Sequence, residues 1–308
     1  MLTGIDHIII GVHDLDAAAR RFSDQLGLRA SGGGIHPSGG TANRIIVIGD
    51  TYLELIAVRV PREAQQSLLE RLAKHEGYLN MVLGSNDLAA DSQAMSERGV
   101  SVIGPAPGQL SSSDGRTRSW QRVDIERPEL AQHYPFLIQH DSAGEERRFR
   151  LAGWAQPPEH PLGAVQVLSA TIAVEDLEEA TRRFGHIYGL EPSEPYTGDV
   201  DGWDALLVSF ALGDGSQHLE LAAPMPLASE EDAEIGMEHL PDAGALRSHL
   251  ARSGESVCRM TLEVGSMHEA RRYLDEHGVT YTYQEDPRPA LWIHPDYACG
   301  ASIVLHEA

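Results

Sequence analysis

Apolar and polar positions follow two different periods at the start of the chain. Residues 5–12, IDHIIIGV, form a short apolar run that is typical of a buried strand. In the next stretch apolar residues recur every three or four positions, as on one face of an amphipathic helix, at Leu15, Ala18, Phe22 and Leu26. Asp14 is a favourable N-cap and Gly27 a favourable C-cap. The pattern predicts a strand followed by a helix.

This strand and helix pattern is repeated along the chain. "HDLDAAARRFSDQLGL" at 13–28 matches "EDLEEATRRFGHIYGL" at 175–190, and each copy precedes a strand pair that ends in "YLELIA" or "HLELAA". A fainter pair links "SERGVSV" at 96–102 with "DEHGVTY" at 275–281. We therefore predict four β-α-β-β-β units, which begin near residues 4, 78, 166 and 257. In the first unit Gly49-Asp50 is expected to form a hairpin turn.

A single unit of this kind covers only one face of its sheet with a helix, so two units must share a sheet. We predict an α+β fold in which four βαβββ modules form two paired, cup-shaped mixed β-sheets. Residues 1–145 are expected to form the first domain and residues 165–308 the second. The intervening residues 146–164 are expected to be a linker, because this region is rich in charge and proline and lacks periodicity.

Charge and composition restrict the classes of partner that the protein is expected to bind. The chain has 24 Lys and Arg against 46 Asp and Glu, a formal net charge of −22, which opposes binding to nucleic acid or to an anionic membrane. No apolar run approaches the roughly 20 residues that a membrane-spanning helix needs, and no signal-peptide pattern is evident. Cys258 and Cys299 form no CxxC pair. We expect a cytoplasmic protein with a small-molecule ligand, either a monomer or a homodimer.

The first unit offers a histidine and a glutamate that could meet. Alternation along a strand puts His7 on one face with Ile9, and Glu54 on one face with Tyr52 and Ile56. If the two strands are neighbours, the imidazole and the carboxylate converge. Both groups suit Zn, Fe, Mn, Co or Ni and would leave positions for water and substrate oxygens. The alternative is a hydrogen-bonded histidine and a solvent-facing glutamate.

Polar residues near this pair could contact a substrate. In "GGGIHPSGGTANR", residues 32–44, closely spaced glycines let the backbone approach a ligand. His36 could serve there as a catalytic acid or base, with Asn43 and Arg44 as substrate-binding residues. Trp120 and Arg122 share a strand face and would suit an aromatic ligand with an anionic group. The alternative for residues 32–44 is a polar loop whose side chains hydrogen-bond only to local backbone groups. The alternative for Trp120 and Arg122 is ordinary packing across neighbouring strands.

These motifs resemble those of the vicinal oxygen chelate superfamily, which includes glyoxalase I, methylmalonyl-CoA epimerase and extradiol dioxygenases. The likeness rests on Asp6-His7, Asp14-Leu15, "GGIHPSGGTANR" and "YLELI" in the first half, and on "LELAAP", "GESVCRMTLEV" and "WIHPDYACGASIVL" in the second. It implies a divalent metal ion held by first-strand and last-strand residues of paired modules. On this chain the ligands would be His7, Glu54 and Gln139, with His140 on the opposite face. The substrate would also meet Tyr52 and Asn80.

The corresponding positions of the second cup are Ser169, Glu220, Arg259 and Val304, which do not suit a metal. Glu220 and Arg259 are expected to form an ion pair, and His294 and His306 are expected to be structural.

Two functions remain open from the sequence. The first is a divalent-metal-assisted lyase or isomerase that acts on a small oxygenated metabolite in the cup of the N-terminal module pair. The second is a metal-free protein that binds or sequesters a small molecule, which the missing ligands in three of the four units favour. Extradiol dioxygenase activity is less favoured, because it normally needs two His and one Glu in a single cup, and neither cup is expected to supply them.

Overall fold

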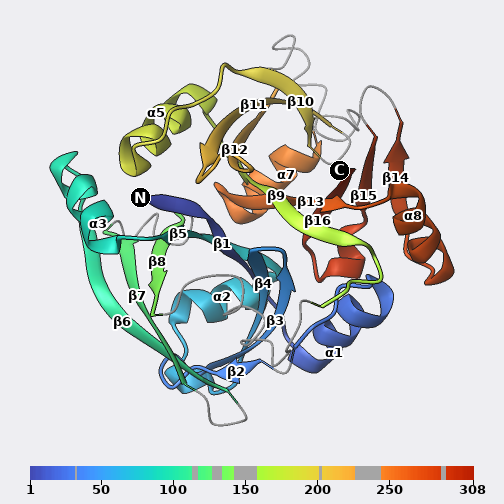
Figure 1. The fold of residues 1–308 in the computed structure, drawn as a ribbon, viewed down its shortest axis with the longest axis horizontal. Coiled ribbons are helices and arrows are strands. Elements are labelled where there is room, and N and C mark those ends of the chain that lie inside the picture. Colours follow the sequence, from blue (N-terminus) through green and yellow to red (C-terminus); the bar gives the residue numbers. More distant parts are fainter. Residues whose placement is uncertain are drawn as a thin grey trace.

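The computed structural model describes residues 1–31, 33–112, 117–126, 134–141, 158–200, 203–225, 244–285 and 289–308. Figure 1 shows two curved sheets side by side, one from the N-terminal half in blue to green and one from the C-terminal half in yellow to red. Most of the expected linker, up to residue 157, lies outside the described residues, so the domain boundary stays a prediction. No helix in the described ranges is long and apolar enough to cross a membrane.

All four expected βαβββ modules are present, which confirms the predicted fold class. Module 1 comprises β1 (Leu2–Gly11), α1 (Leu15–Arg20) with the π-helical turn η1 (Arg21–Gln25), β2 (Gly34–Ile35), β3 (Thr41–Ile48) and β4 (Thr51–Val58). Module 2 comprises β5 (Gly77–Ser85), α3 (Leu88–Glu97), β6 (Val102–Ser112), β7 (Thr117–Ile125) and β8 (Phe136–His140).

The second half repeats this order. Module 3 comprises β9 (Ala164–Ala173), α5 (Leu177–Tyr188), β10 (Tyr196–Val200), β11 (Trp203–Leu212) and β12 (Gln217–Pro224). Module 4 comprises β13 (Ser256–Val264), α8 (Met267–Glu276), β14 (Tyr281–Gln284), β15 (Ala290–Ile293) and β16 (Ser302–Glu307). The connections also contain short helices that the sequence reasoning did not predict: η2 (Pro61–Glu63), α2 (Gln66–Lys74), α7 (Gly244–Ser253) and η3 (Pro295–Ala298).

The two module pairs differ in closure. The N-terminal strands form a closed barrel in the order β1-β4-β3-β2-β6-β7-β8-β5, whereas the C-terminal strands form an open sheet in the order β10-β11-β12-β9-β13-β16-β15-β14. The short strand β2 closes the barrel, because it pairs with β3 on one side and with β6 on the other. The predicted first cup is therefore a barrel. Eight strands enclose a space that can hold one small ligand.

The predicted residues at the two ends of the first helix adopt the expected cap geometry. The Asp14 carboxylate accepts hydrogen bonds from the backbone N–H groups of Ala17 and Asp16, and these bonds lower the pKa of Asp14. Gly27 has a φ of 64°, in the left-handed region that favours glycine. The predicted hairpin turn is also present, with Gly49 at a φ of 56°.

The two halves pack into one structure through a shared hydrophobic core. The repeated phenylalanines, Phe22 and Phe184, are both buried in the same cluster. A polar contact crosses the same interface: the Gln217 side chain accepts from the Ile5 N–H at 2.8 Å and donates to Thr51 Oγ1 at 2.8 Å and to the Val167 carbonyl at 3.0 Å. The Gln217 side-chain amide thus forms hydrogen bonds with groups from both halves.

We expect Gln217→Ala to destabilise the protein by about 1–3 kcal/mol, because the Ile5 N–H would lose its partner at a packed interface. Urea unfolding followed by circular dichroism measures the change. Gln66→Ala is the matched control, since the Gln66 amide only donates to exposed Glu70 at 2.9 Å, and its effect should stay within about 0.5 kcal/mol. Equal stability of the two variants would contradict the bridging role of Gln217.

Candidate functional site

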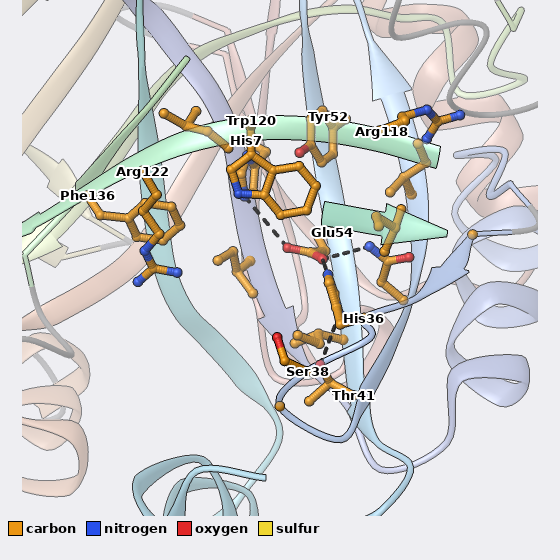
Figure 2. Close-up of a pocket in the computed structure, with 18 of the residues that line it drawn as sticks. His7, His36, Ser38, Thr41, Tyr52, Glu54, Arg118, Trp120, Arg122 and Phe136 are labelled. Atoms are coloured by element: carbon orange, nitrogen blue, oxygen red, sulfur yellow. Dashed lines mark hydrogen bonds and ion pairs between the residues drawn. The ribbon is translucent and has the colours of Figure 1, made fainter. Parts of the chain in front are cut away.

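The barrel encloses a cavity of about 520 Å³. Figure 2 shows its polar side chains gathered around Glu54, with Trp120 in front of them and Arg122 and Phe136 at one end. Helix α2 crosses the barrel opening in Figure 1, and Gln65 and Leu68 at its start also line the cavity. The cavity is apolar along one wall and polar at its centre, as is usual for small-molecule sites.

Strand register explains how His7 and Glu54 meet. Strands β1 and β4 are parallel neighbours, with His7 opposite Tyr52 and Ile9 opposite Glu54. His7 and Glu54 therefore lie on the inward-facing sides of β1 and β4, offset by two residues in register. His7 Nε2 lies 3.6 Å from Glu54 Oε2. The Tyr52 ring stacks on the His7 ring at 4.6 Å between centroids. The convergence expected from strand alternation is present.

The Glu54 carboxylate is buried and has several polar neighbours. Its residue is only 6% exposed. Asn43 Nδ2 donates to Glu54 Oε1 at 2.7 Å, and His36 Nε2 lies 3.5 Å from the same oxygen. His36 Nδ1 is 2.9 Å from Thr41 Oγ1. These side chains come from β3 and from the loop that follows β2.

A glycine-dependent close approach holds that loop against β3. Asn43 Oδ1 accepts from the Gly34 N–H at 2.9 Å. The preceding Gly33 has a φ of 68°, and a Cβ there would lie 1.7 Å from the Asn43 carbonyl oxygen. Only glycine fits this position, so the glycine-rich sequence is what allows His36 to reach Glu54.

Asp6 turns into the barrel because β1 is irregular there. Ile5 pairs with Leu83 and His7 with Val82, so Asp6 is an extra residue in the β1 ladder, a β-bulge. Its buried Oδ1 lies 2.8 Å from His7 Nδ1 and 3.2 Å from His140 Nε2. A carboxylate can only accept, so each of these nitrogens carries the hydrogen in the bond. With Nδ1 bonded to Asp6, the His7 ring directs Nε2 toward Glu54.

The opposite wall combines aromatic and cationic groups. Arg118, Trp120 and Arg122 on β7 all line the cavity. The Arg122 guanidinium lies 3.6 Å from the centroid of the Phe136 ring, and its Nε donates to Asp124 Oδ2 at 2.7 Å. This wall could bind an apolar or aromatic group next to an anionic one.

The expected orientations of Gln139 and His140 are wrong. Trp120 pairs with His140 across β7 and β8, so both side chains face the cavity, whereas Gln139 faces outward. The Gln139 amide caps α3, since its Oε1 accepts from the Leu88 N–H at 2.8 Å and its Nε2 donates to the Asn86 carbonyl at 3.2 Å. Gln139 therefore cannot join His7 and Glu54.

Arg44 and Asn80 also lie outside the cavity. Arg44 alternates with inward-facing Asn43, so its side chain leaves the barrel and pairs with Asp16 at 2.8 Å. Asn80 donates to the Tyr134 carbonyl at 2.9 Å and lines a neighbouring cavity. Among the predicted substrate-binding residues, those that line the barrel cavity are Asn43, Tyr52, Trp120 and Arg122.

The donor atoms do not fit the three-ligand metal site that the superfamily resemblance implies. Glu54 turns Oε2 toward His7 and Oε1 toward His36, so the carboxylate lies between the two imidazoles. His140 is directed at Asp6. Within the described ranges no group of three His, Cys, Asp or Glu side chains is arranged to hold a metal ion.

In the open C-terminal sheet the expected ion pair is present. Arg259 donates to Glu220 at 3.2 Å, and Glu220 also accepts from Thr171 at 2.7 Å and from Ser169 at 3.1 Å. Burial opposes ionisation of Glu220, but Arg259 and the two hydroxyls more than offset it and hold its pKa below the usual value. His294 and His306 make local backbone contacts, with Asp296 N and the Pro289 carbonyl.

Comparison with known proteins agrees with this architecture. A model of the glyoxalase-like domain matches residues 5–188, more than half of the chain, and a model of the glyoxalase/bleomycin resistance protein/dioxygenase superfamily matches residues 170–292. The chain therefore belongs to the glyoxalase-like family of the vicinal oxygen chelate superfamily. No curated protein matches the sequence.

Solved structures resemble the whole chain at low sequence identity. A hypothetical protein from Staphylococcus aureus is 14% identical with a TM-score of 0.62, and the match covers 100% of both chains. A mutant of 4-hydroxymandelate synthase from Streptomyces coelicolor is 11% identical with a TM-score of 0.67, and the match covers 99% of this chain and 93% of that one. At these identities the likeness establishes the fold alone.

We expect Asp6→Asn to change the imidazole ¹⁵N signals of both His7 and His140, because both rings share the Asp6 carboxylate. Long-range ¹H–¹⁵N NMR spectra of the variant and the wild type measure this. His160 is the internal control, since its ring contacts Arg29 N and the Val47 carbonyl instead. A shift of the His7 signal alone would contradict the shared contact.

We expect acid to remove the stability that ionised Glu220 contributes. The folded pKa of Glu220 lies below its ordinary value of 4.5, so the contribution is present above that value and is lost as the pH falls through the folded pKa. In Glu220→Gln the midpoint of urea unfolding should therefore fall less steeply below about pH 4.5 than in the wild type. Parallel pH profiles for the two proteins would contradict this assignment.

Proposed function

We propose that the barrel cavity binds a small organic anion with an apolar or aromatic body and moves a proton on a carbon next to its carbonyl group, which is isomerase or lyase chemistry. The observation that carries this proposal is the buried Glu54 carboxylate, which faces a cavity of about 520 Å³ with an imidazole on each side. A positioned carboxylate and a histidine are suited to general acid–base catalysis.

In the proposed step Glu54 removes a proton from the carbon and becomes the neutral acid, while the electron pair of the C–H bond moves to the carbonyl oxygen and forms an enolate. Return of the proton to the same or the adjacent position completes an isomerisation. Asn43 fixes the carboxylate by its 2.7 Å bond to Oε1, and Oε2 is turned toward His7.

His36 is the proposed route for protons between Glu54 and solvent. Its side chain is 19% exposed, whereas that of Glu54 is 8% exposed. The Thr41 hydroxyl, 2.9 Å from His36 Nδ1, can donate or accept, so it accommodates either tautomer of the ring. His36 can therefore accept a proton at Nε2 from Glu54 or return one to it.

The other wall would select the substrate. Trp120 and Phe136 provide aromatic surface, and Arg118 and Arg122 provide guanidinium groups, of which that of Arg122 is paired with Asp124. Because the donors do not fit a three-ligand metal site, no step is assigned to a metal. The alternative from the sequence, a metal-free binding protein, shares this cavity and differs only in the absence of turnover.

Phenylpyruvate is a suitable first probe, since it joins an aromatic ring, an acidic C–H, a carbonyl and a carboxylate. We expect the wild type to accelerate exchange of its C3 protons in D₂O, measured by ¹H NMR. Glu54→Gln should slow this exchange by roughly 10²-fold or more, because the base is lost. Treatment with EDTA should leave the rate unchanged.

Glu276→Gln is the matched control, because Glu276 lies on α8 with its side chain 59% exposed. The same measurements extend to a panel of 2-oxo and 2-hydroxy carboxylates. Saturable binding without exchange across the panel would favour the binding protein. Exchange that survives Glu54→Gln, or that EDTA abolishes, would contradict the proposed chemistry.

A further inference from the structure

A second cavity, of about 490 Å³, adjoins the first. The two share six lining residues, Ile9, Ile56, Gln65, Leu68, Arg122 and Phe136, so they are immediate neighbours. The second cavity continues past α2 to the end of α7 and the start of β13, which belong to the C-terminal half. A ligand longer than the first cavity would extend into this region.

The far end of the second cavity is cationic. Arg71 and Lys74 lie in the last turn of α2, and Arg252 lies in the last turn of α7. The only carboxylate that lines this cavity among the described residues is Glu70, which already accepts from Gln66 at 2.9 Å. Three cations from two helices thus face a cavity in a chain whose net charge is −22.

These cations lack carboxylate partners in the part of the chain that the structure describes. Half-buried Arg71 donates to the Tyr78 carbonyl at 3.1 Å, and no ion pair joins Arg71, Lys74 or Arg252 to an acid there. Burial and the charge of nearby Arg252 lower the pKa of Arg71. The cluster is therefore one that an incoming anion would stabilise.

Neighbouring histidines do not add to this charge at neutral pH. Burial, followed by the charges of Arg252 and Arg71, lowers the pKa of His249 to about 4. Burial also lowers the pKa of His75, whose Nε2 lies 3.4 Å from the Ser253 hydroxyl that lines the cavity. The positive charge of the second cavity therefore comes from Arg71, Lys74 and Arg252, and hydroxyl groups lie beside these side chains.

We propose that this second cavity is a phosphate subsite, in which Arg71, Lys74 and Arg252 bind a phosphate or diphosphate group of the ligand whose carbonyl end lies beside Glu54. Guanidinium and ammonium groups in this arrangement match the charge and hydrogen-bonding capacity of phosphate oxygens. This proposal depends on the proposed function for the chemistry at the carbonyl end of the ligand, beside Glu54. It restricts the substrate class to phosphorylated carbonyl compounds.

Inorganic pyrophosphate is the direct probe of the subsite, measured by isothermal titration calorimetry. We expect saturable binding to the wild type that Arg252→Gln and Arg71→Gln each weaken by roughly tenfold or more. Arg252 is exposed, so its variant should fold even if that of Arg71 does not. Arg272→Gln on α8 makes the same charge change away from the cavity and should leave binding unchanged.

Glu54→Gln separates this proposal from the proposed function, because it should abolish proton exchange and leave pyrophosphate binding intact. A phosphorylated ketone should then exchange its protons with a lower KM than its unphosphorylated analogue, and Arg252→Gln should remove that difference. Failure of pyrophosphate to bind, equal binding by the Arg252 and Arg272 variants, or equal affinity for citrate would overturn the phosphate subsite.

Discussion

Antiparallel pairing between the first strands of two modules is the constraint on which this structure depends. β1 pairs with β5 in one half, and β9 pairs with β13 in the other. Each module alone would leave one face of its sheet open to water, so this joint is what lets two modules enclose a common interior. Both joints contain register shifts, and the shift in β1 turns Asp6 inward beside His7. The joint that builds the barrel therefore also shapes its polar centre.

The two halves use the same positions for different interactions. Glu54 on β4 and Glu220 on β12 occupy equivalent positions on the last strands of modules 1 and 3, where Glu54 is buried and Glu220 is half-buried. In the barrel the carboxylate meets two imidazoles and an amide, whereas in the open sheet it is neutralised by Arg259 and two hydroxyls. A carboxylate whose charge is fully compensated has little to offer a ligand.

The sequence predicted the architecture because its repeat is explicit and because strand alternation has a fixed period. The same alternation predicted that His7 and Glu54 would meet. It could not predict Asp6, since a β-bulge breaks the alternation without a marker in the sequence. The orientations of Gln139 and His140 do not follow from the metal-ligand positions of the family, because those positions do not fix which residues of β8 face inward, whereas pairing with β7 does. Trp120, which was expected to face inward, pairs with His140 and would have given the correct orientation.

Barrel closure was also beyond sequence reasoning, because β2 contains only Gly34 and Ile35 and has no periodicity to detect. This strand joins the two modules by two residue pairs on each side, whereas β3 and β4 share eight. The segment directly after it carries His36. Parting of this short junction would open the barrel wall and at the same time draw the imidazole away from Glu54, so admission of a ligand and assembly of the acid–base pair would be linked mechanically.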